Sequence, residues 1–225
     1  MQYGRCWLWV AVSVCLVALL GCGKKAGQQI DPGRFEGSVY HNDYLGFEIT
    51  IPAEWTLQDR ETAAQMMRVG EKVVAAGDEN VRAALEASAS RTLTLFTAFQ
   101  HPQGAPVESN PSISCVAEGV AHLPGIQTGA DYLFHAKRML QAGSLRFSFP
   151  REVYVQTVAG VEFHVLATEL VLPPAKIVKN EYFAALRKGY VLLMILKYST
   201  DEERQLLQGI LDTVHLKDRV GGRRA

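Results

Sequence analysis

An almost continuous apolar run near the carboxyl end, residues 189–198, constrains the fold more than any other segment. It reads Gly-Tyr-Val-Leu-Leu-Met-Ile-Leu-Lys-Tyr. The run is far shorter than the roughly 20 residues that a membrane-spanning helix needs. A strand of this composition is typical of a sheet that is covered on both faces. The sequence therefore predicts a layered fold with this run as a central strand.

Other segments supply the remaining strands of the predicted sheet. Residues 44–52 alternate, with Phe47, Ile49 and Ile51 on one face, and Pro52 ends the strand. Turn signals at Ala159-Gly160 and at Lys188-Gly189 indicate hairpins. Further strands are predicted at 91–100, 112–120, 153–158, 161–172 and 178–187, with a last extended piece at His215 and Leu216.

Helical spacing and capping residues indicate four helices. Residues 59–77 begin at a candidate N-cap, Asp59, and a second short helix covers 79–87. Thr128 with Asp131, and Thr200 with Glu203, form capping boxes that open the last two helices. The predicted fold class is α+β: a mainly antiparallel β-sheet covered by helices on both faces, which is an α/β/α sandwich.

The first 22 residues carry an export signal. Arg5 precedes an apolar stretch, residues 6–20, and the segment Leu19-Leu20-Gly21-Cys22 follows. This segment resembles the lipobox of bacterial lipoproteins. The resemblance implies a diacylglyceryl thioether on Cys22, cleavage before it, and acylation (palmitate) of the new amino group. Two alternatives stay open: an ordinary signal peptide in which Cys22 is accidental, and an uncleaved membrane anchor.

The leader determines the expected organisation and address of the chain. We expect a signal peptide at 1–21, the lipidated cysteine and a flexible tether at 22–37, one domain at 38–216, and a basic disordered tail at 217–225. By resemblance to enterobacterial sorting, Gly23 favours the periplasmic face of the outer membrane. The expected location is the cell envelope, with membrane lipid contacted through Cys22.

Charge and cysteine content exclude some functions. The 23 basic residues equal the 23 acidic ones and are scattered, so we expect no nucleic-acid partner. Of the four cysteines, Cys6 and Cys15 leave with the signal and Cys22 is consumed by lipid. Only Cys115 remains in the domain, where we expect a buried, inert thiol and no internal disulfide.

Three segments resemble one known group of proteins. They are residues 44–55, residues 189–196, and the helix 201–212 with the Thr-Val-His-Leu that follows it. Together they are similar to the PsbP-like and DcrB-like α/β/α sandwich proteins, over residues 38–216. The segment 59–89 departs from that pattern. The resemblance implies a mostly non-enzymatic role as an exported lipoprotein or as an accessory subunit of a membrane complex, and it carries over no functional residue.

The sequence contains no recognisable catalytic or metal-binding motif. The six histidines His41, His101, His122, His135, His164 and His215 form no close pair. Strand positions carry Glu152, Glu162, Glu169 and Glu181, which we expect on solvated faces. The aromatic residues Phe147, Phe149, Tyr154, Phe163, Tyr182 and Phe183 could line a pocket or an interface, but core positions are the more common use. We expect no catalytic residue, metal or cofactor, and the ligand-binding residues stay undetermined.

Three functions are compatible with these features. The first is a membrane-tethered, non-enzymatic binding or assembly module with an envelope protein partner, which predicts a large exposed apolar patch. The second is a periplasmic enzyme or small-ligand receptor, which predicts a deep pocket with converging polar groups. The third is a structural spacer without a specific ligand. The first is the hypothesis that the leader and the resemblance favour.

Overall fold

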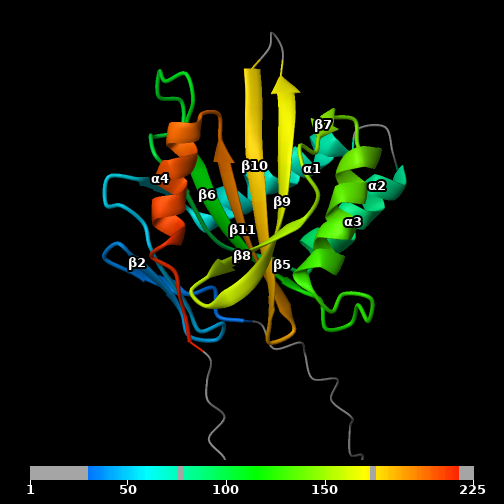
Figure 1. The fold of residues 1–225 in the computed structure, drawn as a ribbon, viewed down its shortest axis with the longest axis horizontal. Coiled ribbons are helices and arrows are strands. Elements are labelled where there is room, and N and C mark those ends of the chain that lie inside the picture. Colours follow the sequence, from blue (N-terminus) through cyan, green and yellow to red (C-terminus); the bar gives the residue numbers. More distant parts are fainter. Residues whose placement is uncertain (1–29, 76–78, 173–175, 218–225) are drawn as a thin grey trace, which may run out of the picture. The chain divides into compact units, whose positions relative to one another are not determined.

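A computed structural model of the chain describes residues 30–75, 79–172 and 176–217 (Figure 1). The predicted signal peptide, Cys22, most of the tether and residues 218–225 lie outside the described residues. A compact unit begins at Asp31 and contains a buried core of its own. We therefore expect a chain that starts inside the tether to fold without the leader.

The compact unit is organised around a large antiparallel sheet. Its strand order is β4-β5-β6-β11-β10-β9-β7, and β8 also pairs with β9. The predicted central strand is β11 (Tyr190–Tyr198), which lies between β6 and β10 and is buried from Val191 to Met194. The other strands are β4 (Thr56–Gln58), β5 (Thr92–Phe99), β6 (Ser112–Gly119), β7 (Phe147–Ser148), β8 (Tyr154–Val158), β9 (Val161–Leu172) and β10 (Lys176–Arg187).

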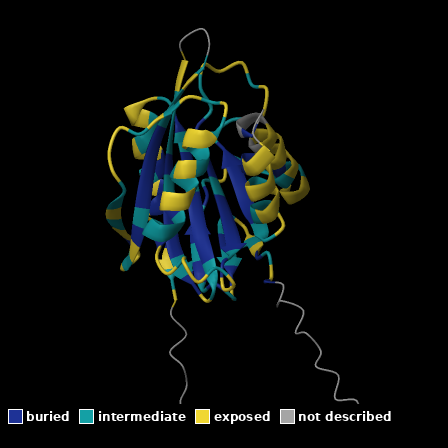
Figure 2. Cartoon of the chain, turned by 90° about the vertical axis from the view of Figure 1, so that its right-hand side faces the viewer, coloured by how far each residue is buried: buried dark blue, intermediate teal, exposed yellow. Residues whose placement is uncertain are grey.

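Three helices cover one face of this sheet. α1 (Arg60–Val74) and α2 (Glu79–Ala89) pack on β5, whereas α3 (Gly129–Ala142) packs on β9 and β10. Met67 of α1 and Leu133 of α3 contact one cluster of buried side chains that includes Val116. Figure 2 shows the buried residues concentrated in the strands, with exposed residues on the outer helix surfaces.

The opposite face carries one helix and a second sheet. Cys115, which adjoins Val116 on β6, points away from the three helices because successive strand residues face opposite sides. Its β5 partner is Phe96, whose ring lies 4.9 Å from that of Tyr40 in the second sheet. This sheet comprises β1 (Arg34–Glu36), β2 (Val39–Asn42), β3 (Phe47–Thr50) and β12 (His215–Leu216), beside α4 (Asp201–Leu211).

The predicted fold class is confirmed, with two differences. The molecule is α+β, with helices on both faces of an antiparallel sheet (Figure 1). The second sheet was not predicted, and β1 lies inside the 22–37 segment that we expected to be a tether. The ordered unit therefore begins before residue 38. Among the described residues, no helix is both long and apolar enough to cross a membrane.

Both predicted capping boxes are present. The Thr128 hydroxyl accepts from the amide of Asp131, whose carboxylate accepts from the amide of Thr128. Thr200 and Glu203 repeat this arrangement at the start of α4. The caps satisfy amide groups that lack partners within the helix, so they fix where α3 and α4 begin.

Candidate functional site

A cavity of about 610 Å³ lies between α2, α3 and the loop that follows β6. α2 and α3 are neighbours on the same side of the sheet (Figures 1 and 2). Small and apolar side chains form most of the cavity wall: Ala84, Ala87, Leu123, Ile126, Ala136 and Met139. A cavity of this size and character suits a small apolar ligand.

One carboxylate, Glu118 of β6, lies in the cavity wall and is only 4% exposed. Its Oε1 accepts from the Ser88 hydroxyl over 2.8 Å and lies 3.5 Å from Nη2 of Arg91. Its Oε2 accepts from the Tyr132 hydroxyl over 2.8 Å. Both oxygens of this buried carboxylate are therefore engaged by protein groups, as a buried charge requires.

The accessible charges of the wall are positive. The side chain of Arg91 is 28% exposed, and Arg138 of α3 is exposed. The Nε of Arg91 is buried and has no hydrogen-bond partner in the described structure. An unsatisfied donor beside a cavity is unusual in folded proteins. The site thus has a buried carboxylate whose two oxygens both accept hydrogen bonds, and an arginine with an unused donor.

A smaller cavity of about 180 Å³ adjoins the first and reaches the sheet at Leu193. The two share Tyr132, Ala136 and Met139, and the inner wall adds Leu85, Leu133, Leu140, Tyr182 and Leu193. Burial raises the pKa of Tyr182 to about 12, so its hydroxyl stays neutral. The inner end of the site is therefore uncharged and mostly apolar.

A second buried carboxylate, Glu181 of β10, lies on the other face of the sheet and is 2% exposed. Its Oε1 accepts from Arg151, Tyr154 and Arg204 at 3.1 to 3.2 Å, which ties β10 to α4 and to β8. The expectation that Glu181 is solvated is wrong, because two arginines and a hydroxyl replace water. We interpret this cluster as a structural link.

The other three strand carboxylates that we considered for a paired site are separate. Glu152 pairs with Lys137, Glu169 accepts from Ser148, and Glu162 is exposed. Their described contacts bring no second carboxylate to any of them. These positions therefore give no support for a two-carboxylate mechanism.

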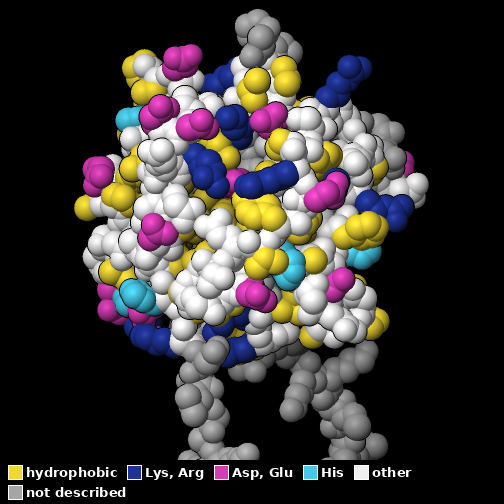
Figure 3. All heavy atoms as spheres, in the orientation of Figure 1, with side chains coloured by type: hydrophobic (Ala, Val, Ile, Leu, Met, Phe, Trp, Pro, Cys, Tyr) yellow, Lys and Arg dark blue, Asp and Glu magenta, His cyan; other side chains and the backbone are white. Residues whose placement is uncertain are grey.

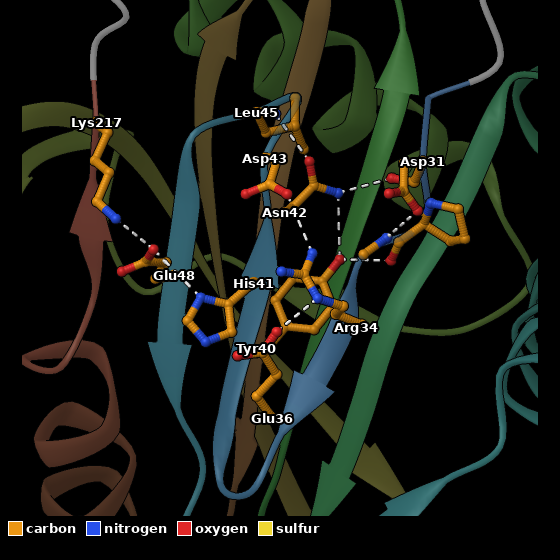
Figure 4. A network of polar contacts seen from close by, with 12 residues as sticks. Asp31, Arg34, Glu36, Tyr40, His41, Asn42, Asp43, Leu45, Glu48 and Lys217 are labelled. Atoms are coloured by element: carbon orange, nitrogen blue, oxygen red, sulfur yellow. Dashed lines mark hydrogen bonds and ion pairs between the residues drawn. The ribbon is translucent and has the colours of Figure 1, made fainter.

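A polar network joins the segment before β1 to the turn between β2 and β3 (Figure 4). The buried Asn42 side chain donates to the carbonyl of Asp31 over 2.9 Å and accepts from the amide of Leu45 over 2.8 Å. The Tyr40 hydroxyl donates to the carbonyl of Pro32 over 2.7 Å. These bonds fix the backbone just before β1, which explains why ordered structure begins inside the expected tether.

The histidines and the cysteine occupy separate places. His135 is in the cavity wall, and His41 lies 3.3 Å from Glu48 in the small sheet. No group of three histidine, cysteine or acidic residues that could hold a metal occurs in the described ranges. Cys115 is fully buried, and burial raises the pKa of its thiol, as the prediction of an inert core cysteine requires.

The aromatic residues are used mainly in the core. Phe163 and Phe183 are fully buried, whereas Tyr182 lines the smaller cavity. Glu118 and Arg91 were not singled out from the sequence. The one signal for Glu118 was a charged residue inside a strand, 112–120, that is otherwise small or apolar.

Exposed apolar side chains are distributed over the unit. They include Leu57 on β4, Met66 and Val69 on α1, Phe134 on α3, and the cross-strand pair Val171 and Ile177 at the β9–β10 hairpin. On the face drawn in Figure 3, acidic, basic and hydrophobic side chains are intermixed. Binding through one large apolar patch is therefore less well supported than binding in the cavity.

Comparison with known proteins finds similarity of backbone only. No family model and no curated protein matches the sequence. Similar solved structures include cyanobacterial PsbP from Synechocystis (TM-score 0.49, 12% identity, covering 82% of this chain and 96% of that one). LpqN, involved in cell envelope biogenesis of Mycobacterium tuberculosis, has a TM-score of 0.42 at 14% identity, covering 76% and 83%. PA94 of Pseudomonas aeruginosa, a protein of unknown function, has a TM-score of 0.39 at 14% identity, covering 57% and 81%.

Proposed function

We propose that the protein is a lipid-anchored, non-enzymatic binding protein of the cell envelope, and that it binds an apolar small molecule between α2 and α3. The cavity of about 610 Å³ with apolar walls is the observation that carries the proposal. It corresponds to the small-ligand form of the functions considered from the sequence. Cys22 supplies the anchor in this proposal.

The polar groups of the cavity wall are engaged with one another, which suits the wall of a binding site. Ser88 donates to Glu118, which already accepts from Tyr132 and contacts Arg91. Three groups thus hold the carboxylate in place. This arrangement fixes a wall of the cavity and orients the arginine beside it.

The anchor would keep this cavity beside a membrane. Each buried methylene contributes about 0.8 kcal/mol, and durable attachment needs more than one acyl chain. A triacylated Cys22 meets that requirement. Replacing Cys22 by alanine should abolish palmitate incorporation in cells, with Cys15→Ala as the matched control in the leader. Equal incorporation in both variants would refute the anchor.

A fluorescence titration tests the cavity. The chain 23–225 is mixed with Nile red, a neutral apolar dye, and the affinity is compared with that of two variants on α2. Ala87 lines the cavity, whereas Ala83 is exposed on the same helix and is not part of its wall. We expect Ala87→Trp to weaken binding at least tenfold and Ala83→Trp to leave it unchanged. Both alanines are exposed, so both variants should fold.

The same titration contains the outcome that overturns the proposal. If the unmodified chain does not bind the dye, or if both tryptophan variants weaken binding equally, the cavity is not a binding site. Circular dichroism and urea unfolding of each variant separate loss of the site from loss of the fold.

A protein partner in the envelope is part of the same proposal. In-cell crosslinking from membranes, run beside the Cys22→Ala form, would recover one complex in fixed stoichiometry if the module also assembles with a partner. Recovery that does not depend on Cys22 would contradict a partner that requires the anchor.

A further inference from the structure

We infer that the ligand of the cavity between α2 and α3 is a single acyl chain that ends in a carboxylate. This inference rests on the proposed function and adds the chemical class of the ligand. It combines three observations: which charges of the wall are accessible, which donor is unused, and where the apolar space continues.

The accessible charges select the head group. Four chargeable side chains line the cavity: Arg91, Glu118, His135 and Arg138. Glu118 is buried and both its oxygens already accept hydrogen bonds, so it offers little accessible negative charge to a cationic head group. Arg91, His135 and Arg138 are accessible, and none of them is acidic. An anion at this position gains attraction from the two arginines without displacing a hydrogen bond to Glu118.

The unused donor of Arg91 favours an acceptor on the ligand. Its Nε is buried without a partner, and its only described ion pair, to Glu118, is long at 3.5 Å. A buried donor without an acceptor destabilises the state that contains it. A ligand carboxylate beside Arg91 would supply the missing acceptor and allow a two-point contact, since the guanidinium fork matches a carboxylate.

The space behind the head group suits a chain. The walls on α2 and α3 are lined by small alanines, and the smaller cavity shares Tyr132 and Met139 with the first and reaches Leu193 of the sheet. Its inner end carries no accessible charge. A flexible chain that enters from the arginine side would bury its methylenes between the helices, and each would tighten binding about fourfold.

Competition with Nile red on the chain 23–225 tests the head group. Dodecanoate, dodecanol and dodecyltrimethylammonium carry chains of similar length and differ in the charge of their head groups. We expect dodecanoate to displace the dye at a concentration at least tenfold below that of the other two. In the series decanoate, dodecanoate and tetradecanoate, each methylene should tighten binding about fourfold until the site is full.

Variants assign the preference to a residue. Arg91→Gln should reduce the affinity for dodecanoate to that for dodecanol and leave Nile red bound, whereas Arg91→Lys should retain most of the preference. Arg34→Gln, at an exposed arginine of β1, is the control for loss of one charge. If Arg91→Gln unfolds, Arg138→Gln gives the same test with a smaller expected loss.

Two results would overturn the inference while the proposed function stands. One is equal displacement by the three C12 compounds; the other is an unchanged carboxylate preference in Arg91→Gln and in Arg138→Gln. Absence of Nile red binding to the unmodified chain is a different result, because it refutes the cavity as a binding site altogether.

Discussion

Arg204 donates from both Nε and Nη2 to one oxygen of Glu181, over 3.2 and 3.1 Å. Arg151 and Tyr154 donate to the same oxygen, and the other oxygen has no hydrogen-bond partner in the described structure. Burial lowers the pKa of Arg204, but the bonds and charge of Glu181 outweigh it and hold the guanidinium protonated. The link joins α4 to the large sheet through a charge that cannot be left unpaired.

The two arginines should therefore contribute unequally to stability. Arg204→Met should lower the free energy of unfolding by about 2–3 kcal/mol, because it removes two bonds from a buried carboxylate. Arg151→Met should cost about 1 kcal/mol or less, since Arg151 is 48% exposed against 35% for Arg204. Urea unfolding at pH 7 measures both. Equal losses would show that Arg204 does not hold α4 in the way described.

A close approach of α3 to β10 depends on one glycine. A Cβ on Gly129 would lie near the carbonyl oxygen of Ala184, too close for any contact, whereas a Cβ on Gly209 of α4 would meet nothing within 4 Å. Gly129→Ala should destabilise the protein by about 1–3 kcal/mol through overpacking. Gly209→Ala should stabilise it by about 0.5–1 kcal/mol, because glycine is unfavourable inside a helix. The midpoint of thermal unfolding should fall in Gly129→Ala and rise in Gly209→Ala. A rise in both variants would contradict the close contact between Gly129 and Ala184.

The elements with regular patterns were predictable from the sequence. The apolar run at 189–198 became β11, and both capping boxes opened helices where predicted. β1 and β2 could not be predicted from the sequence, because residues 34–42 show no sustained alternation of apolar and polar side chains. Their order depends on Asn42, whose partners at 31 and 45 become neighbours only when the turn forms.

The candidate site could not be predicted from the sequence, for a related reason. Glu118 meets Ser88, 30 residues earlier, and Tyr132, 14 residues later. No spacing rule connects a strand to two helices over such intervals. The unmet donor of Arg91 is a property of the packed structure alone. The chemistry of this cavity follows from tertiary contacts, whereas the fold class followed from local periodicity.

The cap of α3 predicts a pH dependence. Hydrogen bonds from Thr128 and from the amide of Gln127 lower the pKa of Asp131 below its ordinary value. The carboxylate therefore contributes stability above its unfolded pKa of about 3.9 and loses it as the pH falls through the lower folded value. In urea unfolding from pH 6 to pH 2, Asp131→Asn should be less stable than the unmodified chain near pH 6 and equal to it near pH 2. Glu54→Gln, exposed in a turn, controls for lost charge; a pH-independent difference would contradict the cap.

The single thiol of the chain 23–225 should report both folding and binding. Cys115 is its only cysteine, and burial both shields this thiol and raises its pKa. A water-soluble disulfide reagent should label it only through opening of the core, and much more slowly than in 6 M urea.

A ligand that binds the folded state alone at 100 times its Kd stabilises that state by about 2.7 kcal/mol. Dodecanoate at that excess should therefore slow labelling about a hundredfold when reclosing outpaces the reagent, whereas dodecyltrimethylammonium should have little effect. Rapid labelling of the folded chain would place Cys115 outside a closed core, and equal protection by both amphiphiles would remove the charge preference assigned to Arg91.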